Sequence, residues 1–298
     1  MGLNLKIYKF IQNEAMELKN RISRELFFWK RRIARILGKG IALMIRLLPI
    51  SVLWKGEILN QIFLIGVLDY KRKNRILLKV NSFTNAVRLK IKEQETVRWL
   101  EEYLKVGEVF YDIGANNGTF SLIAKEINGG KNEVYAFEPG FSNFNVLCEN
   151  IFLNHSQKLI KSFNVALSDK TGLLPFVYSS ISSGAAMHVL EKSLPSDKSL
   201  YQYVISYRID DFIKELDIPY PNHIKIDVDG GELGVLMGAT NTLAYKNLRS
   251  ILIEIDEELE NYKDNNILLE RAGFKLKERH VKTGSKITNC IFVKNKFI

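Results

Sequence analysis

The sequence predicts an α/β protein whose mainly parallel sheet is covered by helices on both faces, preceded by a basic helical extension. From Val109 onward, apolar runs of strand length alternate with helical patterns, which is typical of parallel sheets built from βαβ units. Before residue 73 the apolar residues recur at helical spacing instead. We therefore expect two parts, a helical extension over residues 1–72 and an α/β domain over residues 73–298.

The charge of the chain is distributed unevenly between these parts. The formal net charge is +10, with +14 on residues 1–100 and −4 on the remainder. A basic segment can meet phosphate, anionic lipid or an acidic partner, or it can be a solvated helix face, and the sequence leaves these alternatives open. The two cysteines, Cys148 and Cys290, form no metal-binding or disulfide pattern.

The extension contains one long amphipathic pattern. Over residues 3–37, apolar residues recur every three or four positions, with Lys and Arg between them, so we expect a basic helix that ends at Gly38. It could pack on its own domain, form a dimer, or lie on an anionic membrane surface. Residues 41–54 are interrupted by Arg46 and Pro49 and fall short of the roughly 20 apolar residues of a membrane span, so we expect no transmembrane helix and no secretory signal.

The remaining elements follow from periodicity and breakers. Residues 41–70 are expected to be helical, residues 75–80 and 86–91 to form two strands around a turn, and residues 93–104 to form a helix. The later strands are expected over residues 109–113, 133–137, 161–167, 203–207, 223–228 and 250–255, with a closing antiparallel pair at 274–279 and 287–293. The helices between them are expected over residues 119–127, 143–153, 210–215, 231–243 and 267–272.

The strongest chemical signal is the turn after the strand at 109–113. Asp112 ends the strand, and Gly114, Ala115, Asn116, Asn117 and Gly118 lead into a helix. The glycines allow a tight turn and a close approach, and the helix N-terminus offers free N–H groups and a positive dipole. These groups could hold the carboxylate of a methionine moiety, while Asp112 could bind its ammonium, directly or through water.

The glycine spacing argues against a dinucleotide. A dinucleotide site has the pattern G-x-G-x-x-G, whereas Asn116 stands here where the second glycine would be. Its side chain would obstruct a pyrophosphate but not the smaller amino-acid end of S-adenosylmethionine. Glu138 ends the next strand, 24 residues after Gly114, where a carboxylate can accept hydrogen bonds from both ribose hydroxyls. The alternative is that Glu138 is a solvated loop acid.

Two further segments end strands in acids. Ser168 or Asp169 could reach an adenine amino group, although Asp169 is as well suited to a simple turn. Asp227 ends the strand at 223–228, and Glu232 follows at a helix start. Both are candidates for catalysis or substrate binding, and both could instead be partners of a helix dipole.

Taken together, these motifs resemble the FkbM family of methyltransferases. The matching segments, in the same order and spacing, are Glu95–Trp99, Val109–Gly118, Phe137–Pro139, Ala166–Asp169 and Ile224–Gly230. The resemblance covers residues 75–256. It implies a class I methyltransferase-like (Rossmann-like) fold with a seven-stranded sheet and a reversed last strand. It also implies S-adenosyl-L-methionine as cofactor, and O-methylation of sugars, glycans or natural products.

By motif match, Asp112, Gly114, Asn116, Gly118 and Glu138 would bind the cofactor. Asp229 departs from the family pattern, which has Glu there, so the reach of that carboxylate is shorter. For a hydroxyl acceptor a general base helps, and Asp227 is the first candidate and Glu232 the second.

Other candidates for the base are weaker. His188, in the polar stretch 179–199 that could fold over the substrate as a lid, and His223 are remote alternatives to the two acids. No sequence pattern calls for a metal.

Three functions follow from this reading. The first is an S-adenosylmethionine-dependent methyltransferase acting on a small-molecule or glycan acceptor. The second is a nucleic-acid methyltransferase holding phosphate with the basic extension, which the acidic catalytic part disfavours. The third is a non-catalytic, membrane-recruited protein with the same fold. For the first function we expect no nucleic-acid partner and a cytoplasmic location. Peripheral contact of residues 1–40 with the inner membrane face and formation of a homodimer are left open.

Overall fold

The computed structural model divides the chain into two compact units, residues 1–63 and 64–298. In the first unit only scattered residues between 32 and 47 are described, so the expected helix over residues 3–37 lies largely outside the described residues. The expected boundary after residue 72 stays a prediction. No helix among the described residues is long and apolar enough to cross a bilayer. In the second unit the described residues are 64–71, 75–80, 83–91, 93–186, 188–191, 193, 199–259, 262–282 and 284–295.

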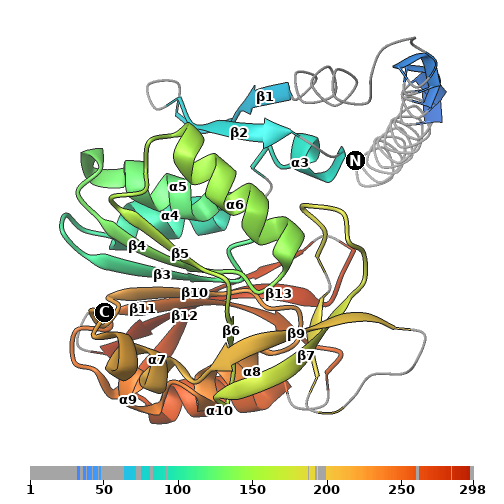
Figure 1. Ribbon diagram of the computed structural model, residues 1–298. Coiled ribbons are helices and arrows are strands. Elements are labelled where there is room, and N and C mark those ends of the chain that lie inside the picture. Colours follow the sequence, from blue (N-terminus) through green and yellow to red (C-terminus); the bar gives the residue numbers. More distant parts are fainter. Residues whose placement is uncertain are drawn as a thin grey trace, which may run out of the picture. The chain divides into compact units, whose positions relative to one another are not determined.

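The second unit is built around a seven-stranded sheet (Figure 1). In hydrogen-bonding order its strands are β12 (Phe274–Val281), β13 (Ile287–Lys294), β11 (Ser250–Asp256), β10 (His223–Ile226), β3 (Val109–Ile113), β4 (Glu133–Phe137) and β5 (Ile160–Phe163). The pairs from β11 to β5 are parallel, and β13 runs antiparallel to both of its neighbours. This confirms the expected class I arrangement with one reversed strand. The strand order reverses between β3 and β10, where ligands bind in such sheets.

Helices cover both faces of this sheet (Figure 1). On one face lie α4 (Gln94–Tyr103), α5 (Thr119–Glu126) and α6 (Phe141–Leu153). On the other lie α7 (Ile209–Leu216), α8 (Glu232–Met237), α9 (Thr240–Ala244) and α10 (Tyr262–Arg271). A short 3-10 turn, η1 (Ile127–Gly129), follows α5. Each helical layer buries its own apolar cluster against one face of the sheet. A smaller third cluster, which includes Phe176 and Val204, lies among the described residues of the segment 166–204.

The strand periodicity sets which side chains share a face. Successive strand residues point to opposite faces, so Phe110 packs with α4 and α5 while Tyr111 packs with α7. In β10, Ile224 lies on the α7 side. Asp112 and Lys225 are register partners in β3 and β10, and both therefore lie on the α5 side. A carboxylate and an ammonium are thus placed side by side in the interior of the sheet.

The strand expected at 75–80 is confirmed as β2 (Leu77–Val80), but one strand prediction and one helix prediction were wrong near the start of this unit. Residues 86–91 form no strand, because α3 (Phe83–Val87) occupies part of this segment. β2 pairs instead with β1 (Leu64–Val67), which lies inside the segment expected to be helical. Ile91 is buried in the first core without being in a strand, so its apolar character reports burial rather than strand structure.

The segment expected as one strand over residues 161–167 is divided between two sheets. β5 stays in the main sheet, whereas β6 (Ala166–Leu167) joins a four-stranded sheet of order β6-β9-β7-β8. Its other strands are β7 (Gly172–Tyr178), β8 (Val189–Leu190) and β9 (Leu200–Tyr207). β7 and β8 were not predicted, because Pro175 interrupts the apolar run of β7 and β8 lies in the polar stretch 179–199.

The single helix expected over residues 231–243 is also divided, into α8 and α9. Gly238 lies between them, and a β-carbon there would come within 2.0 Å of the Ser168 carbonyl oxygen. The break therefore occurs where the chain packs against the segment after β6. Because the contact partner is 70 positions away in the chain, local helix periodicity carries no trace of it.

Trp99 tests the packing of α4 on the sheet. It is 1% exposed, and its indole Nε1 donates to Ser250 Oγ of β11 at 2.9 Å. Trp99→Ala should lower the free energy of unfolding by about 3–5 kcal/mol, because it leaves a cavity and removes the hydrogen bond to Ser250. Urea unfolding followed by circular dichroism measures the change. Phe152→Ala, at a side chain that is 62% exposed, should change stability by less than about 0.5 kcal/mol. Equal losses in both variants would contradict the packing described.

Candidate functional site

The turn after β3 is held by backbone contacts to two neighbouring strands. The N–H groups of Gly114 and Ala115 both donate to the Phe137 carbonyl oxygen of β4 at 3.0 Å. On the other side a β-carbon on Gly114, whose φ is +81°, would lie 1.8 Å from the Asp227 carbonyl oxygen. Only glycine allows both the positive φ and this approach. The turn thereby joins the ends of β4 and β10.

Glu138 closes the same turn from the tip of β4. Its two carboxylate oxygens accept hydrogen bonds from the backbone N–H groups of Asn116 and Gly140, each at 2.8 Å. Each oxygen retains a further lone pair for a ligand. Burial raises the pKa of Glu138 to about 7, against the lowering effect of these two N–H donors. Glu138 and Gly114 line one cavity, so the solvated-loop alternative for Glu138 does not apply.

Helix α5 begins at the end of this turn without a side-chain cap. Its N-cap residue, Gly118, is left-handed with φ +81°. Its β-carbon would lie 2.5 Å from Leu147 Cδ1, so close packing on α6 also requires glycine here. Asn117 Oδ1 accepts from Thr119 Oγ1 at 2.9 Å. The N–H of Thr119 also donates to Asn117 Oδ1, at 3.4 Å, so Asn117 is bonded to the first residue of α5.

Two cavities open at the carboxyl ends of the strands. The larger, of about 320 Å³, is lined by residues of the β3 turn, by Glu138, and by Asp227 and Asp229. The smaller, of about 230 Å³, is mainly apolar and is lined in part by Ser168 and Asp169. Gly114, Pro139 and Val228 line both. The two cavities are therefore neighbours along the edge of the sheet where the strand order reverses.

Unpaired polar atoms mark the larger cavity as a polar binding site. Asn116 Oδ1, Asn117 Nδ2 and His188 Nε2 belong to residues that line it, and all three atoms are buried. None has a hydrogen-bond partner among the residues that the structure describes. Buried polar atoms of this kind normally have partners, so their position fits a polar ligand in the cavity.

A strap from the segment 179–191 crosses this cavity. The carbonyl oxygen of Ala185 accepts from Asn116 Nδ2 at 3.0 Å and from Asn143 Nδ2 at 3.1 Å. The Gly184 carbonyl oxygen accepts from the guanidinium of Arg88. Further along, the N–H of His188 donates to Asp229 Oδ2 at 3.3 Å. The described part of the expected lid is therefore attached directly to the β3 turn.

Asp112 lies beneath the cavity rather than on its wall. It is 1% exposed, and its Oδ2 accepts from Ser121 Oγ of α5 at 2.5 Å. Its Oδ1 has no hydrogen-bond partner within the described part of the chain. Burial raises the pKa of Asp112, against the lowering effect of the Lys225 ammonium. Asp112 does not line the larger cavity, and its predicted binding of a ligand ammonium, directly or through water, stays a prediction.

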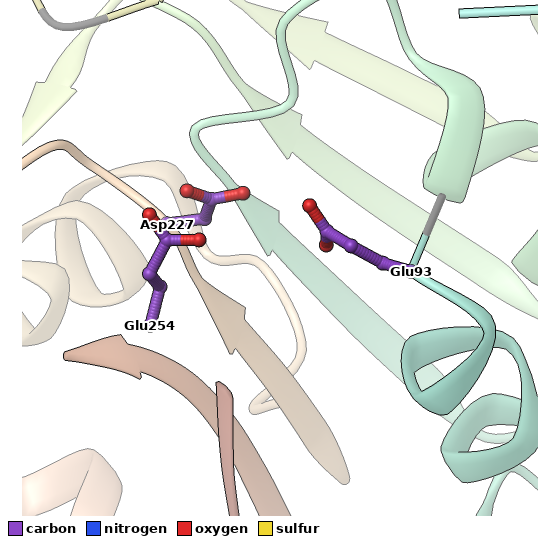
Figure 2. Close-up of side chains that lie close together, drawn as sticks. All are labelled: Glu93, Asp227 and Glu254. Carbon is purple, nitrogen blue, oxygen red and sulfur yellow. The ribbon is translucent and has the colours of Figure 1, made fainter. Parts of the chain in front are cut away.

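Three carboxylates meet at the other end of the larger cavity. Glu93, Asp227 and Glu254 each place an oxygen within 4.8 Å of the others (Figure 2). Two ammonium groups are bonded to them: Lys225 donates to Asp227 at 2.6 Å, and Lys282 donates to Glu93 at 3.2 Å and to Glu254. The sequence predicted no metal. These ammonium groups already supply the positive charge that a cation would bring to the three acids.

The two central acids titrate in opposite directions. Burial pushes the pKa of Asp227 upward, but the ammonium groups of Lys225 and Lys282 outweigh it and hold that pKa below its usual value. Burial, together with the neighbouring Asp227 carboxylate, raises the pKa of Glu254 to about 7. At neutral pH Asp227 is therefore ionised, while Glu254 takes up a proton much more readily than an ordinary glutamate.

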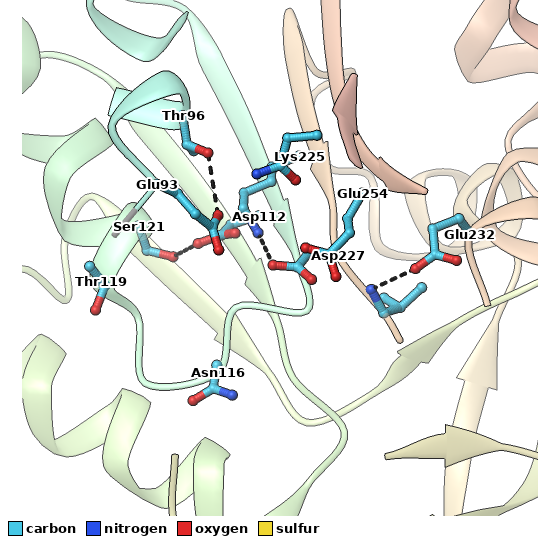
Figure 3. Close-up of polar contacts among 12 residues, drawn as sticks. Glu93, Thr96, Asp112, Asn116, Thr119, Ser121, Lys225, Asp227, Glu232 and Glu254 are labelled. Carbon is cyan, nitrogen blue, oxygen red and sulfur yellow. Dashed lines mark hydrogen bonds and ion pairs between the residues drawn. The ribbon is translucent and has the colours of Figure 1, made fainter. Parts of the chain in front are cut away.

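Glu232 and His223, two candidates for the base, line neither of the two described cavities. Glu232 is 3% exposed, and its Oε1 accepts from the N–H groups of Val228 and Gly230 at 3.2 and 3.1 Å (Figure 3). It shapes the loop after β10. His223 is buried between Ser250 and Glu108. The histidine that does line the larger cavity is His188.

Sequence reasoning missed Glu93, Glu254, Lys225 and Lys282. A signal for Glu254 was present, because it comes near the end of the apolar strand at 250–255, as Asp227 does for its own strand. Lys225 stands at a central position of an apolar strand, which was also visible. The residues before α4 and after β12 gave no comparable signal, since only the fold brings them to the cavity.

The comparisons with known proteins agree with this geometry. Residues 112–276 match the methyltransferase FkbM domain. The hexuronic acid methyltransferase AglP of Haloferax volcanii is 30% identical over 180 residues, covering 60% of this chain and 69% of that protein. The methyltransferase sdnD of Sordaria araneosa is 27% identical, covering 55% of this chain and 72% of that protein.

Solved structures are similar at a lower level. The methyltransferase FkbM of Methylobacillus flagellatus has 18% sequence identity and a TM-score of 0.46, over 63% of this chain and 43% of that one. The domain match spans more than half of the chain and includes the β3 turn, Glu138 and Asp227. The chain belongs to the FkbM family of methyltransferases, enzymes that use S-adenosylmethionine as methyl donor.

Proposed function

We propose that this methyltransferase acts on a hydroxyl group of a sugar, a glycan or another small molecule. The observation that carries the proposal is the pair of acids, Asp227 and Glu254, on the wall of the cavity that also contains Glu138 and the β3 turn. Asp227 and Glu254 suit an acceptor that must lose a proton, whereas Glu138 and the β3 turn suit the cofactor. The name of the relative from Haloferax volcanii supports a sugar-type acceptor.

The cofactor would lie along both cavities. We assign the amino-acid end to the turn formed by Gly114, Ala115, Asn116, Asn117 and Gly118, where unpaired side-chain atoms and the N-terminus of α5 face the cavity. Glu138 would accept hydrogen bonds from both ribose hydroxyls. The smaller, apolar cavity at Ser168 and Asp169 suits the adenine ring.

Asp112 would act on this site through its neighbours. It holds Ser121 at the start of α5 and lies beside Lys225. In this position it shapes the turn and balances the charge of the lysine, and it need not touch the cofactor.

The reaction requires alignment and removal of one proton. When bound, S-adenosylmethionine supplies an electrophilic methyl group, and transfer forms an O–CH₃ bond while the sulfur retains the electron pair of the broken C–S bond. The chain supplies the geometry, because the β3 turn and the strap over it hold the two partners together and exclude water. Asp227, ionised and on the cavity wall, would accept a hydrogen bond from the acceptor.

The charges at the acceptor end favour a hydroxyl over a carboxylate acceptor. Glu93, Asp227 and Glu254 surround this end, and their negative charge would repel an ionised acceptor. A neutral hydroxyl instead donates a hydrogen bond to such a group. An acidic sugar fits if its carboxylate points outward, toward Arg88 and Lys90, which line the same cavity.

The other functions considered gain no support. A nucleic-acid methyltransferase and a non-catalytic membrane-recruited protein both rely on the basic extension, most of which lies outside the described residues. A cytoplasmic location, peripheral membrane contact of residues 1–40 and a homodimer stay predictions.

Glu138 provides a test of the cofactor site. Glu138→Gln removes a charged hydrogen-bond acceptor and should weaken S-adenosylmethionine binding by about 10- to 100-fold, corresponding to about 1.5–3 kcal/mol. Isothermal titration calorimetry measures the change. Glu133→Gln, at the opposite end of β4 and paired with Lys161, is the matched control and should bind normally. If both variants bind as the wild type does, the ribose assignment is wrong.

Cofactor affinity should also depend on pH. The ionised form of Glu138 would accept hydrogen bonds from both ribose hydroxyls. Burial raises the pKa of Glu138 to about 7 in the free protein. Affinity should therefore rise as the pH increases through about 7, and fall below it by at most tenfold per pH unit. Binding measured from pH 5.5 to 8.5 should show this slope in the wild type and lose it in Glu138→Gln. A slope that persists in the variant would assign it to another group.

The acceptor class is tested with a panel of methyl glycosides of neutral sugars and of uronic acids. Purified enzyme and labelled S-adenosylmethionine should label at least one of them. Base-stable label identifies an ether formed at a hydroxyl, whereas base-labile label identifies a carboxyl ester. Label on carboxyl groups alone would overturn the hydroxyl assignment, and no label on any sugar would overturn the sugar-type acceptor.

A further inference from the structure

Glu254 is placed beside Asp227 by the register of the sheet. β10 and β11 are parallel, and Ile226 pairs with Ile253. Asp227 and Glu254 are the next residue of each strand, so they lie side by side on one face. The same face carries Asp112 and Lys225. Glu254 is only 8% exposed, and what it exposes faces the larger cavity.

The charged neighbours of Glu254 come from three parts of the chain. Asp227 and Lys225 belong to β10 and its end, Glu93 precedes α4, and Lys282 follows β12. Figures 2 and 3 show Asp227 and Glu254 together at the strand tips, with Glu93 facing them from the α4 side. Lys282 bonds both glutamates, whereas Lys225 bonds Asp227. Three acids and two ammonium groups therefore share one charge network.

This network makes the two central acids unequal as proton acceptors. Asp227 Oδ2 is bonded to Lys225 at 2.6 Å, and the two ammonium groups keep its pKa low. A carboxylate with a low pKa accepts a hydrogen bond but is a weak base. Burial and the charge of Asp227 raise the pKa of Glu254 to about 7. A general base is most effective when its pKa lies near the working pH.

We propose that Glu254 is the general base of this methyltransferase and that Lys282 and Asp227 are its positioning residues. This inference rests on the proposed O-methylation. As the O–CH₃ bond forms, the proton of the acceptor hydroxyl moves to a carboxylate oxygen of Glu254, and it is later released to solvent through the cavity. Asp227 orients the hydroxyl, and Lys282 holds Glu254 at the cavity wall.

The kinetic test uses the full-length protein, S-adenosylmethionine and the glycoside that the panel identifies. In the wild type, kcat should rise with pH and level off above about 7. Glu254→Gln should lower kcat on the order of 10²- to 10⁴-fold and abolish this rise, with the affinity for S-adenosylmethionine unchanged. Glu108→Gln is the matched control, because Glu108 is also a buried, ion-paired glutamate but lies outside both cavities. It should keep both kcat and the pH profile.

The neighbouring charges should move the profile in opposite directions. Asp227→Asn removes a negative charge that raises the pKa of Glu254, so the rise should shift to lower pH. Lys282→Gln removes a positive charge that lowers the pKa of Glu254, so the rise of kcat should shift to higher pH. A merely structural role for Glu254 predicts neither shift. If Asp227→Asn abolishes the rise while Glu254→Gln keeps it, the base is Asp227 and the proposal is wrong.

A second measurement does not depend on any acceptor. With ¹³C-labelled glutamate carboxyl groups, the resonance that disappears in Glu254→Gln should titrate near pH 7 in the wild type. Titration near about 4.3, the ordinary glutamate value, would overturn the proposal. If no sugar is methylated, the proposed function fails, and this titration still decides whether Glu254 is poised as a base. Loss of turnover with a chelator and recovery with Mg²⁺ would show that Glu93, Asp227 and Glu254 bind a cation. That result would also overturn the proposal that Glu254 is the base.

Discussion

The contact between Gly114 and the carbonyl oxygen of Asp227 is the constraint on which the site depends. A side chain at position 114 would overlap this oxygen, with its β-carbon at 1.8 Å. Because the position is glycine, the turn after β3 can lie directly against the end of β10 while its N–H group bonds the end of β4. The β3 turn, Glu138 and Asp227 are thereby held on the wall of one cavity.

The acids of this cavity can be buried because lysines are buried with them. A lone carboxylate out of water is costly, and a partner charge offsets that cost only when the geometry is close. Lys225 is completely buried between Asp112 and Asp227, and its pKa is raised by both carboxylates despite the opposing effect of burial. The pairing leaves Asp227 ionised and leaves the next acid, Glu254, with a pKa suited to proton transfer.

Much of the fold follows from local patterns. The alternation of strands and helices from residue 109 onward is confirmed, and the bounds of β3 and β4 agree with those predicted. These strands are buried on both faces, so their apolar runs are uninterrupted. Predictions were wrong where tertiary partners decide the structure. Residues 86–91 are apolar because they pack on a core, and the division of residues 161–167 between two sheets depends on pairing with β9.

The sequence by itself determined the family and located the glycine turn at Asp112–Gly118 and the acid at Glu138, because these depend on short segments whose residues act together locally. Only the tertiary structure decided which acids share the cavity. Glu93, Asp227, Glu254 and Lys282 come from distant parts of the chain, and Glu232, which has the same local signal as Asp227, faces the backbone instead. Strand register and face decide this, since a shift of one residue would move each side chain to the opposite side of the sheet.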